Sequence, residues 1–279
     1  MSEQFTEING IKICYEIKGQ GEPLILVHGF GATKEVWIAQ FEPLAEHFKA
    51  IRFDNRGAGK SERPDEPYNM EMFADDIAGL MEHLNIEKAH IMGWSLGGMI
   101  VQQFALKYPE KINKIVLINT LPKWPGDEKG IEMYKNSQID RYHKKLEDPK
   151  EAFFDGAKLG FSRKFRKEMR EKPDKKFFGL FSANDLIEDT ATNPSTPQDI
   201  KNQAHALGSF DVLDKLSNIK NETLILTADK DRQTPKIMNE KIHEEIPNSE
   251  IFVFEGVGHD SPREKAPEMN EKIISFLKK

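Results

Sequence analysis

Ser95 is the residue of this chain whose setting best suits a nucleophile. It occupies the centre of the segment 93–97, Gly-Trp-Ser-Leu-Gly, which is a G-x-S-x-G pattern. An apolar, strand-like run ends at Met92, and apolar spacing predicts a helix over 96–108 that stops before a proline. We therefore predict Ser95 on a sharp strand-to-helix turn. The glycines would leave room where chain segments cross, and the helix N-terminus would support a developing negative charge.

His259 is the predicted general base. It follows a predicted strand over 250–254 through a turn with two glycines, and a helical pattern comes after it. A base for Ser95 must lie on a loop at the carboxyl end of a strand, facing the nucleophile. Five other histidines fall in charged helical stretches and are predicted to be solvated: His47, His83, His143, His205 and His243.

Two aspartates are candidates to orient that histidine. Asp229 and Asp231 both follow a predicted strand over 223–227, and either could reach an imidazole at the same edge of the sheet. The residue types alone leave this choice open.

A glycine-rich loop after another apolar run supplies candidates for an oxyanion hole. The run over 24–27 leads into His28-Gly29-Phe30-Gly31. Acyl transfer requires backbone N–H groups that point at the substrate oxygen. We predict that the amides of Phe30 and Leu96 fill this role, and that His28 is structural.

The pattern of apolar runs predicts the sheet that positions these loops. Strands are expected over 11–17, 24–27, 50–53, 89–92, 114–118, 223–227 and 250–254, with helical patterns between most of them. Several runs are apolar without alternation, as in parallel strands that are buried on both faces. The run over 11–17 alternates and is predicted to be an antiparallel edge strand. The fold class is therefore α/β, with helices on both faces of a mainly parallel sheet.

This rhythm stops between Leu121 and about Ala206, where the chain reads as helical, charged and rich in phenylalanine. We predict a core over 1–121 and 207–279 and a helical cap, or lid, over 122–206. The cap phenylalanines either pack within the cap or line a substrate cavity. They are Phe153, Phe154, Phe161, Phe165, Phe177, Phe178 and Phe181.

Together these motifs resemble the α/β-hydrolase fold superfamily, in its capped serine hydrolase branch, over essentially the whole chain. The matching segments are 28–31, 54–61, 93–98, 224–231 and 256–259, in the order nucleophile, acid, histidine. The resemblance implies about eight strands, a cap inserted after the sixth strand, and chemistry without a cofactor. It also favours Asp231 as the acid, because Asp231 and Pro235 fit the family spacing, although Ala228 stands where glycine is usual. Trp94 either forms a wall of the acyl pocket or is buried in the core.

The predicted activity is hydrolysis of carboxylic esters with small to medium acyl chains, through an acyl-enzyme on Ser95. A serine nucleophile disfavours the dehalogenase and epoxide hydrolase branches, which use aspartate. Enol-lactone hydrolysis, carbon–carbon hydrolysis and cofactor-free perhydrolysis of the haloperoxidase type remain open. A non-enzymatic alternative is a slow hydrolase-fold ligand sensor.

A basic segment in the cap, 163–176, offers a further alternative. The motif over 93–98 is also similar to that of carrier-protein methyl ester esterases, whose cap binds an acidic carrier. In this chain Glu168, Glu171 and Asp174 interleave the basic residues at helical spacing, which favours a solvated, salt-bridged face.

Composition limits the remaining function classes. The 279 residues carry 40 Lys plus Arg and 46 Asp plus Glu, a formal charge of −6, which disfavours nucleic acid as a general partner. No apolar run has the ~20 residues of a membrane helix. The single cysteine, Cys14, is predicted to be a buried apolar residue and excludes a zinc site of several thiolates. We expect a cytoplasmic enzyme with a small-molecule ester as substrate, no metal, and no nucleic acid or membrane partner.

Overall fold

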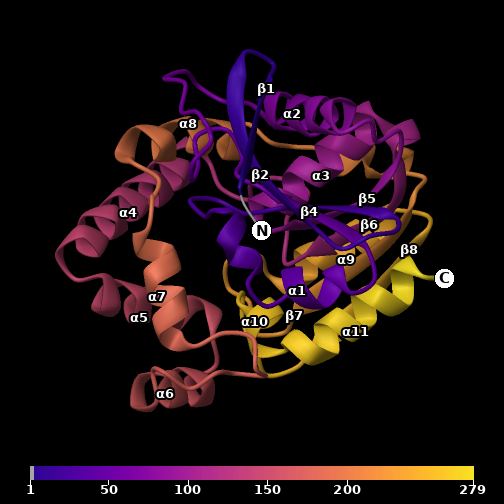
Figure 1. Cartoon of the computed structure of the whole chain (residues 1–279). Coiled ribbons are helices and arrows are strands. Elements are labelled where there is room, and N and C mark those ends of the chain that lie inside the picture. Colours follow the sequence, from indigo (N-terminus) through magenta and orange to yellow (C-terminus); the bar gives the residue numbers. More distant parts are fainter. Residues whose placement is uncertain (1–2) are drawn as a thin grey trace.

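A computed structural model describes residues 3–279 and contains an eight-stranded sheet (Figure 1). The strands are β1 (Gln4–Ile8), β2 (Ile11–Lys18), β3 (Pro23–Val27), β4 (Lys49–Phe53), β5 (Ala89–Trp94), β6 (Ile112–Ile118), β7 (Glu222–Ala228) and β8 (Ser249–Phe254). Their order is β1-β2-β4-β3-β5-β6-β7-β8. Pairs β1–β2 and β2–β4 are antiparallel and the other pairs are parallel. The predicted fold class is confirmed.

Helices cover both faces of this sheet. The core helices are α1 (Phe41–Ala45), α2 (Met70–His83), α3 (Leu96–Lys107), α9 (Lys236–Glu245), α10 (Ser261–Glu264) and α11 (Ala266–Leu277). One buried cluster joins α2, α3 and α9 to the sheet and contains Ile25, whereas a second joins α1 and α11 and contains Leu24 and Leu26. Successive side chains of β3 thus enter different apolar layers, which is why its sequence is apolar without alternation.

The prediction of an edge strand over 11–17 was wrong in one respect. β2 is antiparallel as expected, but β1 pairs with its outer side, for example through Phe5 opposite Cys14, and β1 forms the edge. The sequence analysis missed β1 because most of its residues are polar or exposed, so its apolar signal is weak.

Helices α4 to α8 lie between β6 and β7, to one side of the sheet (left in Figure 1). They are α4 (Glu128–Glu147), α5 (Pro149–Gly160), α6 (Arg163–Glu171), α7 (Ala183–Ala191) and α8 (Pro197–Gly208). An Asp, Ser or Thr side chain caps the N-terminus of each, so the local sequence starts every one of them. α8 extends two residues beyond the predicted boundary at 206.

Most cap phenylalanines pack against one another. Phe153, Phe154, Phe161, Phe177 and Phe181 are buried in one cluster, and Phe165 packs against it. Phe178 is 49% exposed, whereas Phe153 and Phe161 also line a cavity. The expectation of packing within the cap is confirmed for most of the set, and the expectation of a substrate cavity stays a prediction for Phe153 and Phe161. Within residues 3–279, no helix combines the length and apolarity needed to cross a lipid bilayer.

Candidate active site

Ser95 lies at the turn between β5 and α3 in a strained backbone conformation. Its φ and ψ are 59° and −122°, outside the helical and extended regions. The backbone around it is tied down, since the Ser95 amide donates to the Ile118 carbonyl at 3.0 Å and Thr120 Oγ1 donates to the Ser95 carbonyl at 2.7 Å. The turn thus holds the side chain at the carboxyl end of the central strands.

The glycines on either side of Ser95 are required by close approach. A Cβ on Gly93 would come within 2.3 Å of the Gly97 carbonyl oxygen, and a Cβ on Gly97 would come within 2.0 Å of the Val27 carbonyl oxygen. These approaches lie well inside van der Waals contact, so a side chain at either position would displace the backbone.

His259 and Asp231 form a buried pair. Asp231 Oδ2 lies 2.7 Å from His259 Nδ1, and it also accepts from Thr234 Oγ1 at 2.6 Å. Asp231 Oδ1 accepts from the amides of Gln233 and Thr234 at 2.8 and 3.0 Å. Burial acts to raise the pKa of Asp231, but His259 and these donors lower it overall. Burial acts to lower the pKa of His259, yet the charge of Asp231 raises it overall.

Asp229, the other candidate acid, has different contacts. Its Oδ1 accepts from the Gly256 amide at 2.7 Å, and its Oδ2 pairs with Lys230 Nζ at 2.7 Å. It therefore braces the loop that leads to His259, while Asp231 contacts the imidazole directly.

Ser95 and His259 both follow parallel strands at the carboxyl end of the sheet, and no direct hydrogen bond joins their described side chains. The ring of Trp94, adjacent to Ser95 in sequence, lies 5.8 Å from the His259 ring, and Thr234 lines the same cavity as Ser95. Across residues 3–279, Ser95 Oγ forms no hydrogen bond to His259. Such catalytic contacts often tighten only when substrate binds.

The two residues predicted to form the oxyanion hole border the same cavity as Ser95. Phe30 and Leu96 both line the cavity that contains Ser95. A Cβ on Gly29 would lie 3.1 Å from Ser95 Cβ, so the loop passes directly next to the nucleophile. The amide of Gly31 is already used, because it donates to Gln203 Oε1 of α8 at 2.9 Å. Sequence reasoning missed Gln203, which fixes this loop from the cap side.

His28 is fully buried and holds two loops together. Its Nε2 accepts from the Asn55 amide at 2.9 Å, so Nδ1 carries the proton and donates to the Gly29 carbonyl at 2.9 Å. Burial lowers the pKa of His28, which keeps the imidazole neutral. These contacts fit the structural role predicted for it.

Of the two alternatives for Trp94, the structure favours burial in the core, because Trp94 does not line the cavity at Ser95. It is 4% exposed and belongs to the core layer with Trp37, whose ring lies 6.0 Å away. Arg263 covers the Trp94 ring at 5.2 Å. Because β5 is pleated, the residue before Ser95 points into the sheet layer, away from the cavity.

A cavity of about 380 Å³ surrounds Ser95. Helix α4 closes one wall with Tyr134, Gln138 and Arg141, and Arg232 and Gln233 line it from the loop after Asp231. Sequence reasoning missed these polar residues. The signal was present in part, because they recur at helical spacing, but nothing in the sequence showed that this face of α4 turns toward Ser95.

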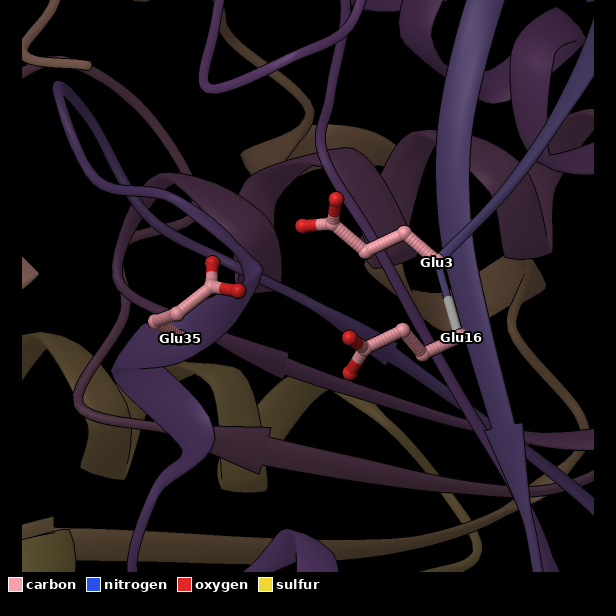
Figure 2. A group of neighbouring side chains, drawn as sticks. All are labelled: Glu3, Glu16 and Glu35. Atoms are coloured by element: carbon pink, nitrogen blue, oxygen red, sulfur yellow. The ribbon is translucent and has the colours of Figure 1, made fainter. Parts of the chain in front are cut away.

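Three half-buried carboxylates outside the cap lie close enough together to be tested as a cation site. Ligand atoms of Glu3, Glu16 and Glu35 lie within 4.8 Å of one another, and Figure 2 shows the carboxylates converging. Basic side chains already occupy the positions around them. Lys34 Nζ contacts Glu3 at 2.9 Å and Glu35 at 2.8 Å, and Arg52 Nε donates to Glu16 at 2.7 Å.

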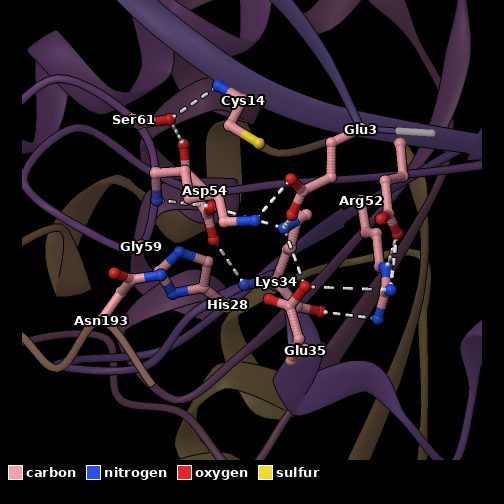
Figure 3. A network of polar contacts seen from close by, with 12 residues as sticks. Glu3, Cys14, His28, Lys34, Glu35, Arg52, Asp54, Gly59, Ser61 and Asn193 are labelled. Carbon is pink, nitrogen blue, oxygen red and sulfur yellow. Dashed lines mark hydrogen bonds and ion pairs between the residues drawn. The ribbon is translucent and has the colours of Figure 1, made fainter. Parts of the chain in front are cut away.

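We call this network the Lys34 cluster (Figure 3). It consists of Glu3, Glu16, Lys34, Glu35, Arg52, Asp54 and Lys60. Asp54 also accepts from the amides of Lys34 and Lys60 at 2.7 and 3.0 Å, so the cluster fixes the loop after β4. Burial raises the pKa of the neighbouring Cys14 thiol to about 12, as expected for an inert buried cysteine.

The basic segment of the cap is paired with acids on its own surface. Lys175 contacts Glu168 at 2.6 Å, and Arg170 contacts Glu151 at 2.8 Å. These contacts match the predicted salt-bridged face and leave less positive charge for an acidic carrier protein.

Comparison with known proteins agrees with this architecture. The chain belongs to the alpha/beta hydrolase fold family, whose model matches residues 22–266.

Relatives within this family carry different activities. The chain is 28% identical to proline iminopeptidase PfmaB of Pestalotiopsis fici, over 99% of both chains, and 26% identical to a putative carbamate hydrolase of Agrobacterium fabrum, over 94% and 97%. Among solved structures, it is similar to a thermophilic esterase from Thermogutta terrifontis, with a TM-score of 0.80, 25% identity, and coverage of 100% and 98%. The choice among such reactions must rest on the site.

Proposed function

We propose that this protein is a serine hydrolase that cleaves carboxylic esters of small to medium acyl chains. The observation that carries the proposal is Ser95 itself, held in a strained turn and opening into a cavity that the oxyanion loop and the loop of Asp231 also line. A cavity of this size suits a small-molecule ester.

The mechanism assigns one role to each group. Ser95 Oγ attacks the ester carbonyl while His259 takes its proton, and Asp231 holds the imidazole with Nε2 toward Ser95. The Phe30 and Leu96 amides stabilise the oxyanion. His259 then protonates the departing alcohol, and the acyl group stays on Ser95. Water, activated by His259, repeats the attack and releases the acid.

The testing experiment measures p-nitrophenol release from acetate, butyrate, octanoate and palmitate esters. Wild type should prefer the shorter chains, and Ser95→Ala should lower kcat/KM by at least about 10³-fold while leaving the fold intact by circular dichroism. A wild type that is folded and inactive on all four esters would contradict the proposal. Binding without turnover would favour a ligand sensor instead.

A further inference from the structure

One face of α4 carries basic residues toward the active-site cavity. Tyr134, Gln138 and Arg141 line the cavity at Ser95, and Lys145 follows one turn later in the adjoining cavity. We call these four residues the Arg141 wall. Their spacing of four, three and four places them on one helix face. No residue of α4 is fully buried, and its apolar contact with the core comes from the partly buried Ile131 and Tyr134 in its first half.

The two cations of the wall have no counterion. Within residues 3–279, neither Arg141 nor Lys145 forms an ion pair or a side-chain hydrogen bond. Burial lowers the pKa of Lys145, and the like charge of Arg141 lowers it further. Two partly buried cations side by side thus cost free energy that an anion between them would recover.

The charged residues that line the cavity at Ser95 all have the same sign. The charged residues that line its cavity are Arg141 and Arg232, and no carboxylate lines it among the described residues. An ester with a negative group is therefore attracted to this cavity, and a cationic ester is repelled.

Acidic groups enter only in the adjoining cavity of about 250 Å³, which shares Gln138 and Arg141 with the first. Asp260 there is paired with Arg263 at 2.6 Å. Asp189 has a pKa that burial raises to about 6, and the cation that most affects it is Arg263. Both carboxyl groups thus interact mainly with Arg263, and neither forms an ion pair with Arg141 or Lys145 among the described residues.

Resting on the proposed esterase function, we propose that the substrate carries a carboxylate in addition to its ester, and that Arg141, assisted by Lys145, binds this carboxylate while Ser95 attacks the ester. A guanidinium presents paired N–H donors that match the two oxygens of a carboxylate. The substrate class is thus a hemiester or acylated hydroxy acid. Arg141 and Lys145 are specificity residues, outside the proton-transfer chemistry.

The test compares matched charged and neutral esters at constant ionic strength. Monomethyl glutarate against methyl pentanoate places the carboxylate on the acyl side, and 4-acetoxybutanoate against butyl acetate places it on the alcohol side. Wild type should prefer the charged ester of at least one pair about tenfold or more in kcat/KM. Arg141→Met should remove that preference mainly through KM, and Arg141→Lys should restore part of it.

The matched control is Lys144→Met. Lys144 directly precedes Lys145 on α4, is exposed, and lines neither cavity. It should keep the wild-type preference, whereas Lys145→Met should reduce it several-fold. Neutral esters cleaved through Ser95 with no preference for charge would overturn the inference and leave the esterase function intact. An equal loss on both esters in Arg141→Met would do the same.

A binding measurement separates the two proposals if no ester is cleaved. Titration of Ser95→Ala with glutarate by calorimetry should show binding that Arg141→Met weakens about tenfold or more. Binding of this kind with no turnover would reject the esterase and keep the carboxylate site. No binding would overturn the site.

Discussion

The Lys34 cluster and the Arg141 wall both keep basic side chains away from bulk water, but they treat the charge in opposite ways. Lys34 is 1% exposed and contacts carboxylates of Glu3, Glu35 and Asp54. Burial acts to lower its pKa, but these carboxylates raise it overall. Burial lowers the pKa of Lys145, and the like charge of Arg141 lowers it further. We infer that a buried charge paired with opposite charges has a structural role, whereas an unpaired charge that lines a cavity is available to bind a ligand.

The largest effect on activity is expected from a change in the buried pair of Asp231 and His259, which we assign to catalysis. Asp231→Asn should lower kcat/KM by about 10³- to 10⁴-fold, because the imidazole loses its orienting partner. The matched change Asp229→Asn should leave the rate within about threefold, since Asp229 contacts Gly256 and Lys230 instead. If both variants lost stability and neither lost rate, Asp231 would belong with the structural pairs.

Removing the centre of the Lys34 cluster should affect stability far more than specificity. Lys34→Met removes the cation paired with Asp54, which is 1% exposed, while Glu3 keeps Lys60 and Glu35 keeps Arg52. We expect a loss of about 2–3 kcal/mol in the free energy of unfolding, measured by urea denaturation. Lys60→Met, on a lysine at the exposed rim, is the control and should cost less than about 1 kcal/mol. If Lys34→Met kept its stability and changed the ester preference, the Lys34 cluster would have a role in substrate binding and not in stability.

Removing the charge of Asp189 in the cap should stabilise the protein, whereas removing the charge of Lys34 should destabilise it. Burial raises the pKa of Asp189 to about 6, and its Oδ2 lacks a hydrogen-bond partner among residues 3–279. Its folded state binds the proton more tightly than the unfolded state, so stability falls as pH rises from about 4 to about 6 and stays lower above that.

Asp189→Asn should therefore raise the unfolding free energy by about 1–2 kcal/mol at pH 8 and much less at pH 4, a value reduced for its partial exposure. Denaturation curves at both pH values measure this difference. The control is Glu188→Gln at the exposed neighbouring position, which should leave the unfolding free energy unchanged at both pH values. Destabilisation by Asp189→Asn at pH 8 would show that the carboxylate has a partner it needs.

The smallest expected effect is a shift in the pH profile. Asp231 raises the pKa of His259 above its usual 6.5, and ester hydrolysis needs the neutral imidazole. The kcat/KM of a neutral ester should thus rise with pH through an inflection above 6.5. In Asp231→Asn the residual activity should show a lower inflection. An inflection at or below 6.5 in the wild type would contradict the charged pair.

Most of the sheet was predictable because its strands carry a strong local signal. The runs over 24–27 and 224–226 are apolar throughout, because burial on both faces of the sheet favours apolar side chains at every position. β1 escaped notice because an edge strand with exposed side chains needs only a partner, and β2 supplies it. Its pairing is a property of two segments together.

The same contrast divides the candidate site. Ser95 and His259 stand in motifs whose glycines and flanking runs are local. The choice of Asp231 over Asp229 needed the resemblance at first, and the contact of 2.7 Å with His259 now supports it physically. The choice between pocket wall and core for Trp94 needed the structure, because adjacency to Ser95 in sequence does not show which side chains surround it.

The sequence by itself determined the strand-to-helix turn at Ser95, the order of the catalytic candidates and the helical nature of the cap, because turns, caps and apolar periods are encoded in neighbouring residues. Only the tertiary structure decided which charges find partners. Lys34 meets Glu3 and Asp54 across the sheet edge, while Arg141 meets a cavity, and both outcomes depend on residues far apart in the chain. Burial and pairing are properties of the packed molecule, so the function of each charge is fixed there.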